Sequence, residues 1–149
     1  RRNGLHMPLE DLYRLSKFEL SLMLIRESSK EKGIPRPLQN ATWEQAILDP
    51  NFIPQMEWID FNKFRKSVIK VVSDQLKKTA SLGKKVREII CDDFEACKKL
   101  HLRTAALALS LSQALKDYFG ELVANIITVI VVFHLSLDYF CRCDLMKES

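Results

Sequence analysis

The sequence predicts an all-α protein: a compact single-domain bundle of about five helices with a very apolar C-terminal helix. Apolar residues recur at three- and four-residue steps over most of the chain. The glycines and prolines fall mainly at the ends of these periodic segments, where helices begin or stop. With 149 residues, 47% of them hydrophobic, the chain can bury one core without disulfides. We therefore expect residues 1–149 to form one helical domain, with residues 1–7 disordered or derived from cloning.

The first predicted helix covers residues 9–32. Leu12, Leu15, Phe18, Leu22 and Ile25 recur along one face of it. A glycine at position 33, followed by prolines at positions 35 and 37, is the order expected after a helix C-terminus.

A short second helix is predicted from Thr42 to Leu48. Thr42 and Gln45 have the spacing of a capping box, in which each side chain bonds to the backbone of the other residue. Pro50 ends this helix because its ring disfavours helical geometry at Asp49. Residues 51–59 are too apolar for an exposed loop, and we expect this connection to pack onto the core.

The clearest helical pattern covers residues 60–80. One face carries the apolar residues Phe61, Phe64, Val68, Val71, Val72 and Leu76. The opposite face carries Lys63, Lys66, Lys70 and Lys77 within a stripe about 60° wide, at 100° per residue. Ser81-Leu82-Gly83 breaks the pattern, so we expect this helix to end before residue 81.

Two further helices are predicted before the C-terminal segment. One covers residues 84–100, and the next covers residues 102–119, which are rich in the helix formers alanine and leucine. Gly120 marks the joint that follows.

The C-terminal segment, residues 122–140, contains sixteen residues without a formal charge, from Leu122 to Leu137. A buried core helix is the favoured interpretation, because sixteen helical residues span about 24 Å and a bilayer core is about 30 Å thick. A membrane anchor from Leu122 to Phe140 is the main alternative. A strand is a third, because residues 126–132 are mostly β-branched.

Four cysteines, at positions 91, 97, 141 and 143, allow three pairings, and their spacing requires none of them. Free, partly buried thiols in a reducing compartment are the favoured interpretation. Cys97 and His101 share the four-residue spacing of metal ligands, but the second ligand pair of a structural zinc site is absent. We expect no metal and no cofactor. The expected location is intracellular and cytoplasmic, with membrane association as the alternative.

Basic residues are concentrated in the middle of the chain. The formal net charge is +4, but residues 63–103 contain twelve basic and five acidic residues and carry +7. A local excess of this size favours an electrostatic docking surface. The candidate partner-binding residues are Lys63, Lys66, Lys70, Lys77, Lys78, Lys84 and Lys85. A lysine stripe also solvates an amphipathic helix without any partner, and this alternative stays open.

The sequence contains no pattern specific to catalysis. The four glycines are isolated and form no phosphate-binding loop, and no nucleophile is placed beside a histidine and an acid. We therefore expect a non-enzymatic helical protein–protein interaction module, an adaptor that docks its basic amphipathic helix on an acidic protein surface or polymer. A membrane-associated protein anchored by Leu122–Phe140 is the alternative function. Nucleic acid fits less well, because Phe64 and Phe94, the aromatic residues among the basic ones, belong to the apolar faces of their helices.

Overall fold

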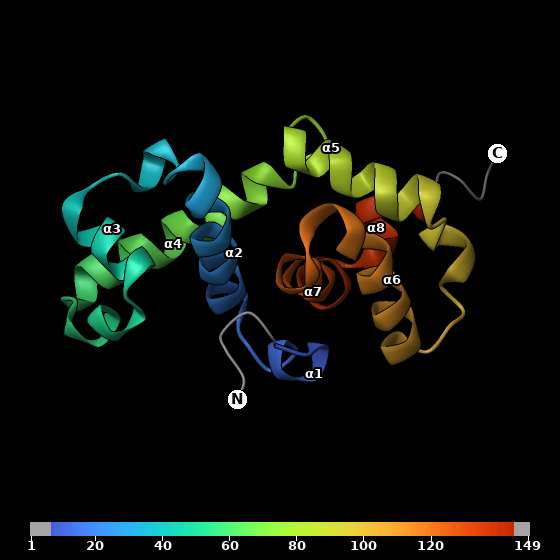
Figure 1. Cartoon of the computed structure of the whole chain (residues 1–149), viewed down its shortest axis with the longest axis horizontal. Helices are drawn as coiled ribbons and strands as arrows, with labels where there is room; N and C mark the ends of the chain where they lie inside the picture. The colour runs from blue at the N-terminus through green and yellow to red at the C-terminus, as the bar shows by residue number, and fades with distance from the viewer. Residues whose placement is uncertain (1–6, 145–149) are drawn as a thin grey trace. The chain divides into compact units, whose positions relative to one another are not determined.

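The computed structural model describes residues 7–144, which group into two compact units (Figure 1). One unit contains residues 16–75, and the other contains the described residues before position 16 and after position 75. All regular secondary structure within residues 7–144 is helical, so the all-α prediction is confirmed. The helices are shorter and more numerous than the five expected. Residues 1–6 lie outside the described range, and so does nearly all of the expectation about residues 1–7.

The unit formed by residues 16–75 contains three α-helices and two short 3-10 helices. They are α2 (Lys17–Lys32), η1 (Arg36–Leu38), α3 (Ala41–Leu48), η2 (Pro50–Gln55) and α4 (Trp58–Gln75). The helices α2 and α4 pack against each other, and α3 contacts α2 and η2. The core between them includes Phe64, whose ring lies near those of Phe18 and Trp43.

The predicted helix over residues 9–32 is divided at Ser16. The Ser16 hydroxyl accepts a hydrogen bond from the Glu19 backbone N–H at 3.1 Å, and the Ser16 N–H donates to Glu19 Oε1 at 2.9 Å. This capping box starts α2 and separates it from the one-turn α1 (Leu9–Leu12), because the cap residue is extended rather than helical. The predicted end at Gly33 is confirmed, with a φ of +77°.

The short helix α3 ends at the predicted position but begins one residue before it. Asn40, not Thr42, provides the N-cap: its Oδ1 accepts from the Trp43 N–H at 2.9 Å. On the inner side of the unit, Arg26 Nε donates to the Ile47 carbonyl at 2.6 Å and joins α2 to α3. Burial lowers the pKa of the Arg26 guanidinium, against a smaller opposite effect of the Glu27 charge.

The prediction that residues 51–59 pack onto the core is wrong at its C-terminal end. Phe52, Ile53 and Met56 are half-buried, but Trp58 and Ile59 are 72% and 71% exposed. These two residues belong to the first turn of α4, which starts before the predicted position and ends at Gln75. An apolar residue in a first turn that points away from the core is indistinguishable by composition from a buried one.

The other unit is built from α1, α5 (Ser81–Arg87), α6 (Thr104–Phe119), α7 (Glu121–Val129) and α8 (Leu137–Cys141). Two π-helical segments, η3 (Glu88–Asp93) and η5 (Ile130–Leu135), continue α5 and α7, and η4 (Ala96–Lys99) is a 3-10 turn. The predicted joint at Gly120 is confirmed, with a φ of +80°. The predicted helix over residues 84–100 is interrupted at Glu95, whose φ is +57°.

The apolar C-terminal segment forms the core of this unit. Almost every residue from Leu122 to Val131 is buried, and α7 lies against α6 and α1 (Figure 1). Its polar groups are bonded internally: Thr128 Oγ1 donates to the Ala124 carbonyl at 2.8 Å, and Asn125 Nδ2 to the Met7 carbonyl at 3.0 Å. The buried-helix interpretation of this part of the segment is therefore confirmed.

A single long helix over residues 122–140 does not form. Ser136 has a φ of +86°, which ends the helical run and allows α8 to turn back. None of the helices within residues 7–144 combines the length and the apolar character that crossing a bilayer requires.

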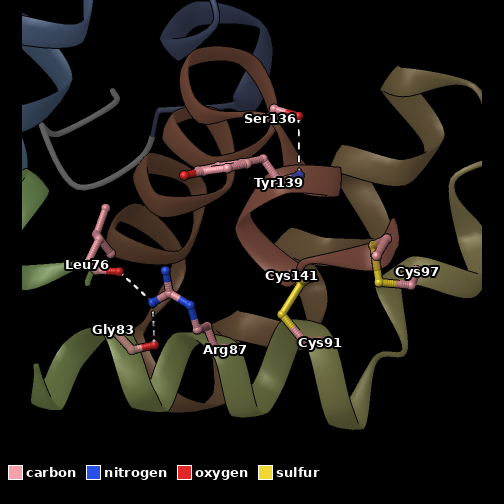
Figure 2. The surroundings of a disulfide bond; sticks show 9 residues. Leu76, Gly83, Arg87, Cys91, Cys97, Ser136, Tyr139 and Cys141 are labelled. Atoms are coloured by element: carbon pink, nitrogen blue, oxygen red, sulfur yellow. Dashed lines mark hydrogen bonds between the residues drawn. A yellow bond between two sulfur atoms is a disulfide. The ribbon is translucent and has the colours of Figure 1, made fainter. Parts of the chain in front are cut away.

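Two disulfides connect α8 and the residue after its C-cap to the middle of the chain. Cys91 pairs with Cys141 and Cys97 with Cys143 (Figure 2). The expectation of free thiols is therefore wrong for all four cysteines. The turn at Ser136 is the physical reason, because it returns the chain toward η3 and η4, and no spacing rule predicts that return.

The predicted break at Ser81-Leu82-Gly83 lies inside α5 instead. The true break is at Leu76 to Ala80, and Gly83 is buried against it: a Cβ atom there would lie 1.9 Å from the Lys77 carbonyl oxygen. Figure 2 shows the Arg87 guanidinium beside this joint, where it donates to the Leu76 and Gly83 carbonyls. Burial lowers the pKa of Arg87, whose guanidinium also lies over the Phe140 ring at 4.0 Å.

We predict that Ile127→Ala destabilises the protein by about 2–4 kcal/mol, because Ile127 in α7 is fully buried and its truncation leaves a cavity. Urea unfolding followed by circular dichroism measures this free energy. Ile59→Ala is the matched control, since Ile59 is exposed and its truncation should cost less than about 0.5 kcal/mol. Equal effects of the two substitutions would contradict the burial of α7.

We predict that Gly83→Ala costs about 1–3 kcal/mol, even though alanine is the better helix former, because the added Cβ collides with backbone atoms of Leu76 and Lys77. Thermal unfolding measures the change. Ser81→Ala, at an exposed position of the same helix, should leave the melting temperature nearly unchanged. A stabilised Gly83→Ala variant would show that α5 does not approach this backbone.

We predict that the oxidised protein exposes no reactive thiol, even when unfolded in denaturant without a reductant. Alkylation with iodoacetamide followed by mass spectrometry should add nothing before reduction and four groups after it. Reduction should destabilise the protein by about 2–5 kcal/mol, because each disulfide closes a long loop, with sequence separations of 50 and 46. Alkylation of the unreduced protein would contradict the two pairings.

Candidate functional site

Three of the seven candidate lysines form one face of α4, here called the α4 basic face: Lys63, Lys66 and Lys70. All three are exposed, and at 100° per residue they fall within about 60° around the helix axis. The opposite side of α4 is anchored, since Phe64, Val68, Val71 and Val72 are buried. The α4 basic face is therefore held by a helix whose other face belongs to the core.

The three lysines differ in their electrostatic surroundings. Lys70 Nζ lies 3.0 Å from Asp74 Oδ2 one turn later, an exposed pair that neutralises part of the charge. Within residues 7–144, Lys63 and Lys66 have no acidic partner in reach. The net positive charge of the α4 basic face comes mainly from Lys63 and Lys66.

Two exposed apolar side chains lie at the N-terminal end of the same helix. Ile59 is four residues before Lys63 and lies on the same face, while Trp58 flanks it and contacts Phe61, with ring centroids 6.0 Å apart. The start of α4 is fixed by Trp43, whose Nε1–H donates to Asp60 Oδ1 at 3.0 Å. Sequence reasoning missed Trp58 and Ile59 as site residues, although the four-residue step from Ile59 to Lys63 could have indicated a shared face.

The other four candidate lysines belong to the second unit. Lys77 and Lys78 are exposed in the turn before α5, and Lys84 is exposed on α5. Lys85 is already engaged: its Nζ lies 3.3 Å from Glu88 Oε1 and 4.2 Å from the centre of the Tyr118 ring. The structure therefore divides the seven predicted residues between the two units, and only the three on α4 share a helix face with an apolar neighbour.

The residues that could have supported chemistry are not brought together. His134 and Asp138 are four residues apart, the spacing of one helix face, but both are exposed and Ser136, with a φ of +86°, interrupts the helix between them. Cys97 is in a disulfide and cannot ligate a metal ion with His101. In the described range, no group of three or more histidine, cysteine, aspartate or glutamate side chains is arranged to hold a metal ion.

Comparison with known proteins gives no further guide to the site. No protein-family model, curated protein or solved structure matches the chain.

Proposed function

We propose that this protein is a non-enzymatic helical interaction module that docks the α4 basic face on an acidic protein surface. The observation that carries the proposal is the combination, on one anchored helix, of two exposed apolar side chains and two lysines that have no acidic partner in the described part of the chain. A lysine stripe that only solvates a helix requires no apolar residues beside it. Tryptophan in particular is enriched at the energetic centres of protein interfaces.

The same combination indicates the chemistry of the partner. Trp58 and Ile59 supply apolar area at the first turn, and the lysines follow it one, two and three turns along α4. A partner helix with carboxylates beside an apolar patch would match both properties. Docking of this kind requires no chemical step, and we include an adaptor role in the proposal.

The membrane alternative is less well supported. Leu122 to Val131 are buried within their own unit, so this part of the C-terminal segment is committed to the protein core. The disulfides support a further revision: we propose an oxidising environment for the working protein, in place of the cytoplasmic location that the sequence favoured.

The test replaces Lys63 and Lys66 by glutamate in the full, oxidised chain. The probe is a labelled synthetic helical peptide with glutamate and leucine at three- and four-residue spacing, followed by fluorescence anisotropy. We expect the double variant to bind the peptide roughly 5–30-fold more weakly, because two attractions become repulsions at a partly desolvated interface. Binding of the unmodified chain should weaken as salt rises, since exposed charges are screened within about 8–10 Å.

The matched control is the double variant Lys32→Glu with Arg36→Glu. Both residues are exposed, belong to the same unit and lie off α4, and the net charge changes by the same amount. Equal weakening by the two double variants would show a general charge effect and contradict the proposed face. Binding to phosphatidylserine vesicles or duplex DNA without binding to the peptide would contradict the choice of a protein partner.

A further inference from the structure

A cavity of about 690 Å³ opens in the unit that contains α1, α6 and α7. Its walls come from α1 and the residue before it, from one side of α6, and from the start of α7, with Phe133 at one side. This volume falls within the range of about 300–1,000 Å³ that is typical of small-molecule sites. The cavity lies in a different unit from α4 and is independent of the proposed docking function.

Much of the exposed apolar surface of this unit is gathered around the cavity. Tyr13, Leu109 and Phe133 all line it and are 58%, 55% and 37% exposed. The Tyr13 and Phe133 rings meet edge to face, with centroids 4.9 Å apart, so two of the walls brace each other. Three large apolar side chains around one concave surface favour a ligand with an apolar body.

A buried polar pair in the cavity wall, Ser112 and Asn125, determines which hydrogen-bonding groups the ligand needs. The Ser112 hydroxyl donates to Asn125 Oδ1, and Asn125 Nδ2 donates one N–H to the Met7 carbonyl. Within residues 7–144, no group donates to Ser112 Oγ, and the second amide hydrogen of Asn125 has no acceptor. The pair therefore presents one acceptor and one donor, which a hydroxyl group satisfies together.

The charged groups at the rim favour a neutral head group over an anionic one. Glu10, Glu121 and Lys116 line the opening, and the Lys116 ammonium lies 3.9 Å from a Glu121 carboxylate oxygen. Among the described residues, the rim holds two carboxylates and one ammonium group, and a carboxylate ligand would lack the proton that Ser112 can accept.

We infer that this cavity binds a neutral small molecule with a long or aromatic apolar body and one hydroxyl group. The apolar body lies against Tyr13, Leu109 and Phe133, and the hydroxyl exchanges hydrogen bonds with Ser112 and Asn125. A small molecule fits better than a second protein chain, because the polar pair is buried in a concave wall rather than spread over a flat surface.

The test uses the full, oxidised chain and the neutral fluorescent probe N-phenyl-1-naphthylamine. We expect probe fluorescence to rise on binding and to be reversed by 1-decanol, with decanoate at least tenfold weaker as a competitor. Ser112→Ala should weaken competition by 1-decanol roughly threefold to tenfold, which corresponds to one neutral hydrogen bond. No fluorescence rise would overturn the site, and equal competition by decanoate would overturn the hydroxyl assignment.

Ala105 and Ala106 provide a matched pair of variants to locate the probe. Both are exposed on the first turn of α6, but only Ala105 lines the cavity. Ala105→Trp should reduce probe affinity at least tenfold and Ala106→Trp less than twofold, with unchanged circular dichroism for both. Equal effects would overturn the location. Sedimentation tests whether a second copy of the chain occupies the cavity instead. If the unmodified chain is a dimer that binds no probe, and Ala105→Trp makes it a monomer, the cavity belongs to a dimer interface and the inference is overturned.

Discussion

The burial of α7 is the constraint on which its unit depends. Residues 122–131 form a helix that is apolar on nearly all sides. A helix at the surface buries only one face, so this helix must be packed against other elements on most of its sides. α6 and α1 pack against it, and each buried polar group on α7 finds a partner in the unit: Asn125 bonds Ser112 and the Met7 carbonyl, and Thr128 bonds its own helix. These bonds make the core compatible with two polar side chains and also place a polar pair in the cavity wall.

The segment from Ser136 to Cys143 is held in place by the two disulfides and by Arg87. The helical run that begins with α7 ends after Leu135, where Ser136 has a φ of +86°. The reversal brings Cys141 and Cys143 to η3 and η4, where the disulfides close. Arg87 completes this region by donating to the Leu76 carbonyl in the α4–α5 joint and to the Gly83 carbonyl in α5, while its guanidinium covers Phe140. Covalent and packed contacts thus fix the same part of the chain.

The sequence predicted what local chemistry decides. Gly33 and Gly120 end helices because their positive φ costs glycine little, and the buried face of α4 follows from its period. Prediction from the sequence failed where tertiary contacts determine which of several locally possible structures forms. Asn40 and Thr42 both have side chains that can cap α3, and the structure uses Asn40. Trp58 is apolar, but its residue type does not show whether it is buried or exposed. The cysteine pairing depends on residues about 50 positions apart, which no local pattern encodes.

The candidate docking site shows the same distinction between composition and geometry. The net charge of +7 over residues 63–103 counts each of twelve basic residues equally. In the structure, these residues differ in their acidic and apolar neighbours. Lys70 and Lys85 have acidic neighbours within 3.3 Å, and the seven chosen lysines belong to two different units. Lys63 and Lys66 lie on the anchored helix that also exposes Ile59 and Trp58, and unlike Lys70 they have no acidic partner among the described residues. Net charge is therefore a poor guide to a binding face. A better guide is an unpaired charged side chain that lies beside exposed apolar side chains, because contact with a complementary protein pairs the charge and buries the apolar surface, and both changes favour binding.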